Sequence, residues 1–509
     1  MPQVKVYRSG MLIARSDPAP GDTVLKHLSD SGIFLDAPCG GRGRCGKCLV
    51  RLSPDGVEVR ACQTVITGDT DIYLPGEMEM EIAGDTKSGT DTPPPAAAGG
   101  EPLGVAVDIG TTTVVAHLTS LRTGGRAATA GGVNAQRPYG ADVISRIQYC
   151  ASNGHGQLTA LIRGQLRGLI AEACADAGAD PRAIEYIAIA GNTIMEHLAA
   201  DLSPAGMGVA PFRPLSLFGD DTPVWEELGA APGAAVYFAP AISSYVGGDI
   251  TAGMLAAGLE DTEGPCVYID IGTNGEIAMK LGDRYLCCAT AAGPAFEGAE
   301  IAMGMAAVQG AVNHVVWEDG AVKFTTIGGA PAEGFCGSGL LDALALLIRQ
   351  GAVDETGRLL SREEASGAIS EYLESKDGKN IFRLARDCKV YMDYADVRKL
   401  QLAKSAIAAG IQTLLAHAGI GEDGVRSFVL AGGFGSFMDK DSAAAIGLFP
   451  KVFLPVTRTV GNTAGEGAAL ALCSAGARAA LSAMRERCGY IELSTSPVFN
   501  EQFVEQMMF

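Results

Sequence analysis

Short runs of alternating hydrophobic and polar positions at the start of the chain predict a small α+β unit. The runs VKVYR (4–8) and MLIAR (11–15) flank Ser9 and Gly10 and predict a β-hairpin. Asp22 or Thr23 can cap a short helix that has one apolar face. Further short strands are expected at 49–52, 58–66 and 71–74. We therefore assign residues 1–83 to a first domain.

The pattern changes twice after this unit. Residues 84–102 contain three consecutive prolines among Ala, Gly and polar residues, so they predict a linker without a core. From residue 103 onward, longer apolar strands alternate with helical patterns, as in Arg163–Gly178 and Val397–Ala418. In the second of these, Leu400, Ala403, Ile407 and Ile411 share one face. We expect residues 103–509 to form one large domain of two subdomains, with the second beginning near residue 265.

Composition narrows the classes of function. The net charge of −19 argues against nucleic-acid or anionic-membrane partners. There is no N-terminal signal pattern and no run of eighteen apolar residues, so we expect a cytoplasmic protein. The six histidines form no ligand-spaced group.

Four cysteines stand out among the thirteen, because they have the spacing C-x5-C-x2-C-x13-C in a glycine-rich loop. They are the candidate metal ligands Cys39, Cys45, Cys48 and Cys62. Glycines allow the backbone to wrap closely around an inorganic core, so the pattern favours a 2Fe-2S cluster. Structural zinc and four unliganded thiols are the alternatives. The remaining cysteines are scattered and are expected to be reduced, packed thiols.

Arg42, Arg44, Lys47 and Arg51 make the rim of this loop basic within an acidic protein. They could form a docking patch for an acidic partner or be solvated loop charges; the sequence leaves both open.

Two copies of a strand–Asp-Ile-Gly-Thr–strand pattern occur in the second part of the chain. The first is LGVAVDIGTTTVVAHL from residue 103, and the second is CVYIDIGTNGEIAM from residue 266. Such a hairpin can surround phosphate oxygens with N–H groups and hydroxyls, while its leading aspartate can hold Mg²⁺ or the water shell of the ion. Aspartates that cap ordinary turns are the alternative. Two copies indicate a duplicated fold with facing phosphate hairpins.

A third element, FVLAGGFGSF (428–437), is a buried strand that ends in a glycine pair, which can lie directly beneath a nucleoside. The segments AGNTIMEHL and GNTAGEGAALA both contain Gly-Asn-Thr, and we expect their helices to pack together. Glu297, Glu300 and Asp342 could face the cleft or lie at the surface, and Cys336 is expected to be a packed thiol.

These motifs resemble two known folds. The first domain looks like the β-grasp fold of plant-type and adrenal-type ferredoxins, although its cysteine spacing differs. The remainder resembles the superfamily of actin, sugar kinases and heat-shock chaperone ATPases, which implies two five-stranded lobes that close on MgATP. The expected fold class is thus an α+β β-grasp ferredoxin-like domain followed by an α/β duplicated actin-like ATPase fold. The resemblance implies Asp108 and Asp270 as catalytic residues and assigns nucleotide binding to Gly110, Thr111, Thr112, Thr113, Gly272, Thr273, Asn274, Gly432, Gly433 and Gly435.

The order of all these motifs along the chain resembles the reductive activators of corrinoid-dependent enzymes. This resemblance implies ATP-dependent transfer of one electron from the cluster to a Co(II) corrinoid protein of a methyltransferase system, which restores Co(I). It also implies a cellular low-potential electron donor and is compatible with a homodimer. Plant-type clusters lie near about −400 mV, and an acceptor about 100–150 mV lower would cost about 2–3.5 kcal/mol per electron. The alternatives are a small-molecule kinase with a redox-sensing appendage and an ATP-independent electron carrier.

Overall fold

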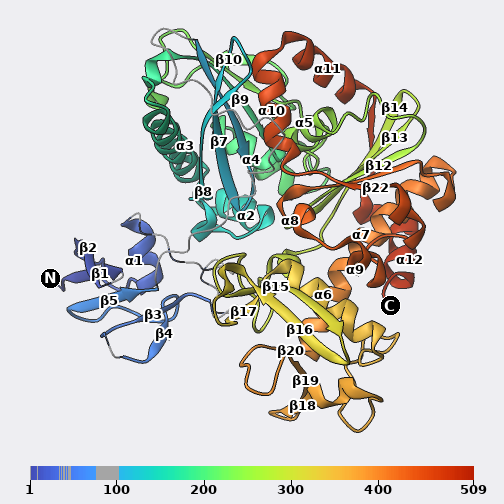
Figure 1. Ribbon diagram of the computed structural model, residues 1–509. Coiled ribbons are helices and arrows are strands. Elements are labelled where there is room, and N and C mark those ends of the chain that lie inside the picture. The colour runs from blue at the N-terminus through green and yellow to red at the C-terminus, as the bar shows by residue number, and fades with distance from the viewer. Residues whose placement is uncertain are drawn as a thin grey trace.

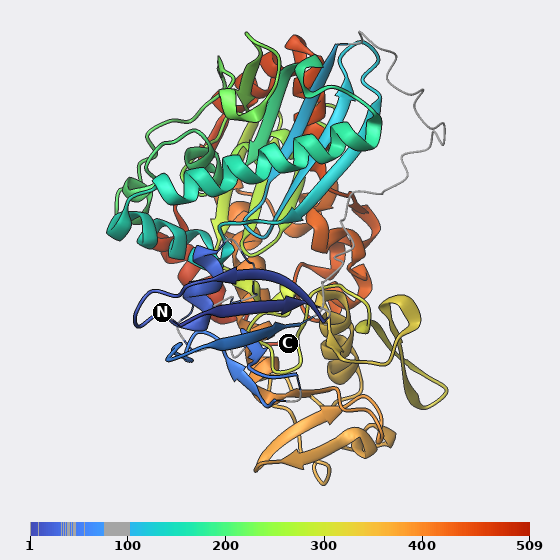
Figure 2. The ribbon, with the colours of Figure 1, turned by 90° about the vertical axis from the view of Figure 1, so that its left-hand side faces the viewer.

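The computed structural model describes residues 2–8, 10–31, 33, 35, 37, 41, 43, 47–54, 56–75 and 102–509. A small N-terminal domain lies beside a larger body, and the body contains two sheet-based lobes (Figure 1). A view from the side shows the N-terminal sheet against the lower part of that body (Figure 2). No helix in the described ranges is long and apolar enough to cross a lipid bilayer.

The N-terminal domain is a five-stranded sheet in the order β2-β1-β5-β3-β4. Its strands are β1 (Val4–Arg8), β2 (Met11–Ser16), β3 (Leu49–Arg51), β4 (Glu58–Arg60) and β5 (Thr70–Leu74). The central strands β1 and β5 are parallel, and β1 and β2 form the expected hairpin. Helix α1 (Val24–Asp30) starts at Thr23, whose hydroxyl accepts a hydrogen bond from the Lys26 N–H. Buried Val4, Val6, Val24, Leu28 and Ile72 join helix and sheet in the β-grasp arrangement.

The first lobe contains a six-stranded sheet in the order β10-β11-β9-β6-β7-β8. The strands are β6 (Leu103–Ile109), β7 (Thr113–Ser120), β8 (Arg126–Val133), β9 (Ile184–Gly191), β10 (Asp221–Pro223) and β11 (Ala235–Phe238). The lobe also contains α2 (Val143–Asn153), α3 (Gly156–Ala177) and α4 (Thr193–Ala199), and α3 covers β7 and β8.

The second lobe repeats this topology in a sheet of order β22-β21-β12-β13-β14-β23. The strands are β12 (Cys266–Ile271), β13 (Gly275–Leu281), β14 (Arg284–Thr290), β21 (Ser427–Ala431), β22 (Thr457–Thr459) and β23 (Cys488–Tyr490). Helix α7 (Tyr394–Ala418) packs on β13 and β14, and the side chains of Leu400, Ala403, Ile407 and Ile411 are buried as expected.

Each lobe therefore has one strand more than the five expected. The additional strands, β10 and β23, are three-residue edge strands, so they have too few residues for a recognisable alternating pattern. The other five strands of each sheet follow the duplicated order that the two hairpins predict.

Two smaller sheets extend the second lobe. One contains β15 (Ala311–Glu318), β16 (Ala321–Thr326) and β17 (Gly334–Phe335), next to α6 (Gly337–Arg349). The other contains β18 (Leu373–Lys376), β19 (Lys379–Arg383) and β20 (Tyr391–Asp393). The remaining helices are α5 (Gly248–Ala256), α8 (Gly432–Phe437), α9 (Lys440–Ala445), α10 (Thr463–Cys473), α11 (Ala475–Glu486) and α12 (Pro497–Glu505).

Helices α5 and α10 lie between the two large sheets (Figure 1). The structure corrects the expectation that the two Gly-Asn-Thr helices pack on each other, because α10 packs mainly on α5 instead of α4. At the crossing, Gly467 lies directly on the Ala252 carbonyl, and a Cβ at Gly467 would overlap it. This close approach selects α5, because its small residues admit the neighbouring backbone.

Candidate functional site

The two Asp-Ile-Gly-Thr motifs form the turns of matching β-hairpins. In the first, the Gly110 N–H donates to the Thr113 carbonyl at 2.9 Å, and in the second the Gly272 N–H donates to the Asn274 carbonyl at 2.9 Å. Asp108 and Asp270 are the penultimate residues of β6 and β12, and each is partly buried. The duplicated topology brings these two aspartates close together between the lobes, and we call this place the cleft.

Four carboxyl groups influence one another in this cleft. Burial, opposed by the Asn462 hydrogen bond, raises the pKa of Asp108 to about 6. Burial and the neighbouring Asp108 raise the pKa of Asp270 to about 7. Burial, then Asp270 and Asp108, raise the pKa of Asp249 to about 8, and burial with Asp249 and Asp270 raises the pKa of Glu276 well above its usual value. A cation or hydrogen-bond donors would relieve this repulsion.

Sequence reasoning missed Asp249 and Glu276. Asp249 lies in the first turn of α5 after two glycines, and Glu276 follows Asn274-Gly275 on β13. Glu196 on α4 is a third missed carboxyl: it is fully buried, and both its oxygens lack a hydrogen-bond partner among the described residues. Each of Asp249 and Glu276 directly follows a Gly-Gly or Asn-Gly pair. This local pattern could have marked both carboxyl groups as candidate site residues.

These carboxylates are a suitable donor set for a divalent cation that accompanies phosphate. In the part of the chain that the structure describes, no three His, Cys, Asp or Glu side chains come close enough to hold an ion alone. Mg²⁺ in nucleotide sites usually retains several waters and is held by one or two carboxylates plus the phosphates. The repelling, partly desolvated carboxylates fit that mode.

Two asparagines connect the hairpins to helix starts. Asn192 caps α4 and donates from its side-chain amide to the Thr111 hydroxyl at 3.0 Å. Asn462 caps α10 and donates to the Asp108 carboxylate at 2.8 Å. The two Gly-Asn-Thr segments therefore have equivalent capping roles but hold different atoms of the first hairpin.

Glu297 lies between the two hairpins. Its carboxylate accepts from the Thr112 hydroxyl at 3.2 Å and from the Thr273 hydroxyl at 2.6 Å. The sequence left open whether Glu297 faces the cleft or lies at the surface. These two hydrogen bonds place its carboxylate in the cleft. Asp342 instead is buried on α6 and contacts the His314 ring, and the Glu300 carbonyl accepts from Lys399.

The three glycines of the motif FVLAGGFGSF (428–437) differ in backbone conformation and burial. Gly432 has a φ of +89°, and a Cβ there would overlap the Asp270 carboxylate. Gly433 is exposed, whereas Gly435 is buried against Leu430, with its nearest neighbour 3.6 Å from an added Cβ. The backbone at Gly432 thus brings the candidate nucleoside turn into contact with the second hairpin, at Asp270.

Of the four candidate cluster ligands, Cys48 and Cys62 lie within the described residues. Cys48 is 1% exposed in the domain core, and Cys62 packs against the same core. Gly41 and Gly43 have φ values of +78° and +73°, and a Cβ at Gly41 would lie 3.8 Å from that of Cys62. The left-handed φ of these two glycines, one of them beside Cys62, suits a backbone that follows a thiolate-bound cluster. Cys39, Cys45, Arg42 and Arg44 lie outside the described residues. Cys336, as expected, is a buried thiol, and it donates to the Val312 carbonyl at 3.3 Å.

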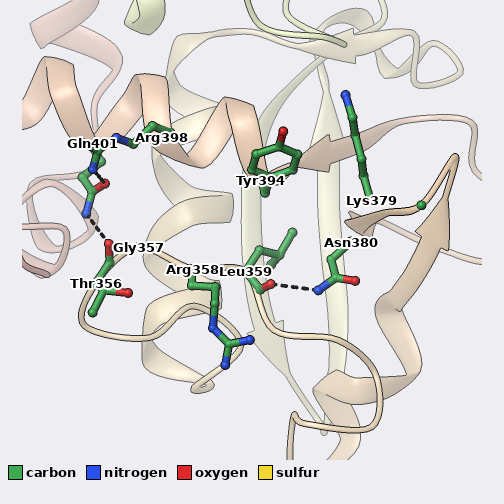
Figure 3. Close-up of a pocket in the computed structure, with 10 residues that line it drawn as sticks. Thr356, Gly357, Arg358, Leu359, Lys379, Asn380, Tyr394, Arg398 and Gln401 are labelled. Carbon is green, nitrogen blue, oxygen red and sulfur yellow. Dashed lines mark hydrogen bonds between the residues drawn. The ribbon is translucent and has the colours of Figure 1, made fainter.

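A separate cavity of about 600 Å³ lies between α7, β19 and the 356–359 turn (Figure 3). Arg358 in its wall is already paired with Asp354 at 3.3 Å and with Glu364 at 2.8 Å. Gln401 and Asn380 donate to the carbonyls of Thr356 and Leu359. The cavity shares no residue with the phosphate hairpins, and its polar groups serve to hold the surrounding turns.

The chain matches two family models. The C-terminal domain of RACo, the ASKHA domain, matches residues 264–509, and the RACo middle region matches residues 103–262.

Relatives that cover two thirds of the chain or more agree with these matches. The corrinoid activation enzyme RamQ of Eubacterium limosum is 31% identical over 94% of both chains. The Co(II) methylated amine-specific corrinoid protein reductase of Methanosarcina barkeri is 25% identical over 68% of this chain and 66% of its own. A solved reductive activator for a corrinoid, iron–sulfur protein superposes with a TM-score of 0.72 at 29% identity, covering 100% of this chain and 98% of the other. The chain belongs to the RACo family, the reductive activators of corrinoid proteins.

Proposed function

We propose that this protein is an ATP-dependent reductive activator that gives one electron to an inactive Co(II) corrinoid protein and restores its Co(I) state. The observation that carries this proposal is the presence, in one chain, of a cysteine-loop domain and a cleft with two facing phosphate hairpins. Membership of the family supports the same activity, because its characterised relatives are named as corrinoid activation enzymes and reductases. A kinase would need no cysteine-loop domain, and a plain electron carrier would need no cleft.

The proposed cofactors are an iron–sulfur cluster of the 2Fe-2S type and MgATP. When bound, the cluster supplies one electron and the nucleotide supplies the free energy for transfer to a lower-potential acceptor. Cys39, Cys45, Cys48 and Cys62 would hold the cluster. Asp108 and Asp270 would hold the hydrated cation, and Asp249 and Glu276 are further carboxyl groups whose raised pKa values the cation would lower.

The hairpin residues would hold the phosphates. The Thr111, Thr112 and Thr273 hydroxyls, with Thr113 and Asn274 at the hairpin ends, are the proposed donors. Gly110 and Gly272 would let the backbone turn tightly beside the phosphates, while their own N–H groups close the hairpins on the Thr113 and Asn274 carbonyls. Gly432, Gly433 and Gly435 would form the floor beneath the nucleoside.

The proposed partners are a corrinoid protein of a methyltransferase system and a cellular one-electron donor of low potential. A homodimer is part of the proposal, and sedimentation velocity tests it.

The deciding experiment is an anaerobic visible spectrum of the reduced protein mixed with a Co(II) corrinoid protein, with and without MgATP. We expect the Co(I) absorbance to appear with MgATP while the reduced protein is oxidised by one electron per cobalt. Cobalt reduction without ATP would favour the plain carrier. Phosphorylation of a small molecule without cobalt reduction would favour the kinase.

A further inference from the structure

A single loop, residues 293–305, contacts every element assigned to the nucleotide. Glu297 accepts hydrogen bonds from Thr112 of the first hairpin and Thr273 of the second. One residue earlier, the Phe296 ring stacks on Phe434 of α8, with ring centroids 5.5 Å apart and planes 19° apart. Phe296 is 1% exposed, so this contact lies in the interior. We call residues 293–305 the bridging loop.

The same loop contacts the cysteine-loop domain at its other end. The Lys47 ammonium donates to the Gly304 carbonyl at 2.7 Å and to the Ile301 carbonyl at 3.4 Å. Lys47 directly precedes the candidate ligand Cys48. Part of the basic rim is therefore bound to the chain's own ATPase domain rather than presented to an acidic partner.

Further contacts attach the bridging loop to α7 and β17. The Ala302 N–H donates to the Asp396 carboxylate at 2.9 Å, and Lys399 donates to the Glu300 carbonyl. Gly304 pairs with Phe335 of β17, and the Ile301 side chain is 1% exposed in the main core. Because the loop is tightly packed between Glu297 and Gly304, a displacement of Glu297 has to be passed on to the carbonyls that Lys47 contacts.

We infer that the bridging loop is a docking surface for the iron–sulfur domain and that nucleotide binding releases this domain. The inference rests on the proposed nucleotide site. The Thr112 and Thr273 hydroxyls cannot donate to phosphate oxygens and to Glu297 at once. A phosphate chain also brings negative charge next to the Glu297 carboxylate. Nucleotide therefore favours the arrangement in which Glu297 has left the hairpins, and by linkage the docked domain weakens nucleotide binding.

Docking through Lys47 suits a reversible contact. Both contacts of the Lys47 ammonium with the bridging loop are to carbonyl dipoles, and water can replace these dipoles when the domain leaves. Release would free the cluster end of the domain, next to Cys48, to approach a protein partner. The docked state would hold that end against the ATPase domain.

Lysine acylation of the anaerobically purified full-length protein tests this inference. An acylating reagent is applied without nucleotide, with MgADP and with a non-hydrolysable ATP analogue, and the labelling rate of Lys47 is measured against that of Lys5 by mass spectrometry. Lys5 lies on β1 of the same domain and serves as the internal reference. We expect the ratio of Lys47 to Lys5 labelling to rise about tenfold with the ATP analogue, as for a contact that opens on ligand binding.

Two variants separate the causes, and nucleotide affinity is measured for each with a fluorescent analogue. Glu297→Ala removes the link to both hairpins, so the ratio should no longer depend on nucleotide. Lys399→Met loosens the bridging loop without touching the hairpins, so it should raise the ratio in the absence of nucleotide.

The inference is overturned if wild-type protein binds the analogue while the labelling of Lys47 stays constant, or if Glu297→Ala keeps the full nucleotide response. Absence of any nucleotide binding by the wild type would overturn the proposed function itself, and the inference with it.

Discussion

The side-chain amide of Asn462 lies 2.8 Å from the Asp108 carboxylate and joins the start of α10 to the first phosphate hairpin. The Asn462 carbonyl oxygen at the same time accepts from the Gly465 N–H at 3.0 Å and caps the helix. One residue therefore fixes a helix start between the lobes and orients a carboxylate in the cleft.

These two roles can be separated by substitution. Asn462→Ser should keep the cap but lose the contact with Asp108, because the serine side chain is shorter. Asn462→Ala should lose both and cost about 1 kcal/mol of stability from the missing cap. We expect both variants to bind MgATP more weakly and only the alanine variant to melt at a clearly lower temperature. Equal nucleotide affinity in all three proteins would contradict a role for Asn462 in the cleft.

Gly432 should be intolerant of alanine. An added Cβ would overlap the Asp270 carboxylate, and the φ of +89° would be strained by about 1–3 kcal/mol. We expect Gly432→Ala to lower nucleotide affinity at least about tenfold, since one carboxylate of the cation site must move. Gly435→Ala is the matched control, because its Cβ would make ordinary contacts at 3.6 Å. Isothermal titration with MgADP would compare the two, and similar affinities would argue against the tight packing at Gly432.

The two cofactors should be separable by mutation. Asp270→Ala should remove ATP-driven cobalt reduction and leave the iron content unchanged. Cys62→Ser and Cys45→Ser should lower the iron content and abolish reduction, while MgADP still binds. Cys473→Ser, which changes an exposed thiol on α10, is the control for cysteine loss. Full ATP-driven activity in Asp270→Ala would show that the phosphate assignment is wrong.

Lys404 gives the protein a measurable pH dependence. This side chain is 1% exposed on α7, donates to the Met508 carbonyl at 2.5 Å, and lies 4.9 Å from the centre of the Phe509 ring. Burial lowers its pKa from 10.5 to about 8. Between these two values the unfolded chain binds more protons than the native protein, so the free energy of unfolding should rise with pH in this window.

Comparison with Lys404→Met isolates this contribution. Between about pH 7.5 and 9.5, the wild type should gain about 1–2 kcal/mol relative to the variant. Urea unfolding at the two pH values measures the difference. A constant difference between the two proteins would mean that Lys404 titrates normally.

The pattern of hydrophobic and polar residues was sufficient to predict those parts of the fold that one continuous segment of sequence determines. The strand–turn–strand hairpins around Asp108 and Asp270, the buried face of α7 and the β1–β2 hairpin all follow from residues close in sequence. The strands β10 and β23 were missed because three residues are too few for an alternating pattern, and β23 is also defined by a partner, β14, far away in the sequence.

The site divides in the same way. The glycines and threonines of the hairpins were recognisable because the turn itself demands them. Asp249 and Glu297 lie next to the hairpins because α5 and the bridging loop pack there. A short stretch of sequence marks these two residues as candidates at most and cannot show the packing. The partner of α10 was mispredicted for the same reason, since the small residues of α5 determined that contact. The assignments of Cys39 and Cys45 remain predictions from spacing.

The contact between Lys47 and the carbonyls of Ile301 and Gly304 has a consequence for how such proteins can diverge. Main-chain oxygens are present whatever side chain a position carries, so substitutions at residues 301 and 304 that preserve the backbone path leave the receptor intact. On the side of the small domain, this contact requires that the lysine is retained. The contact between the two domains therefore depends on the backbone path of residues 301–304 more than on their side chains. It can persist among homologues whose surfaces share little sequence.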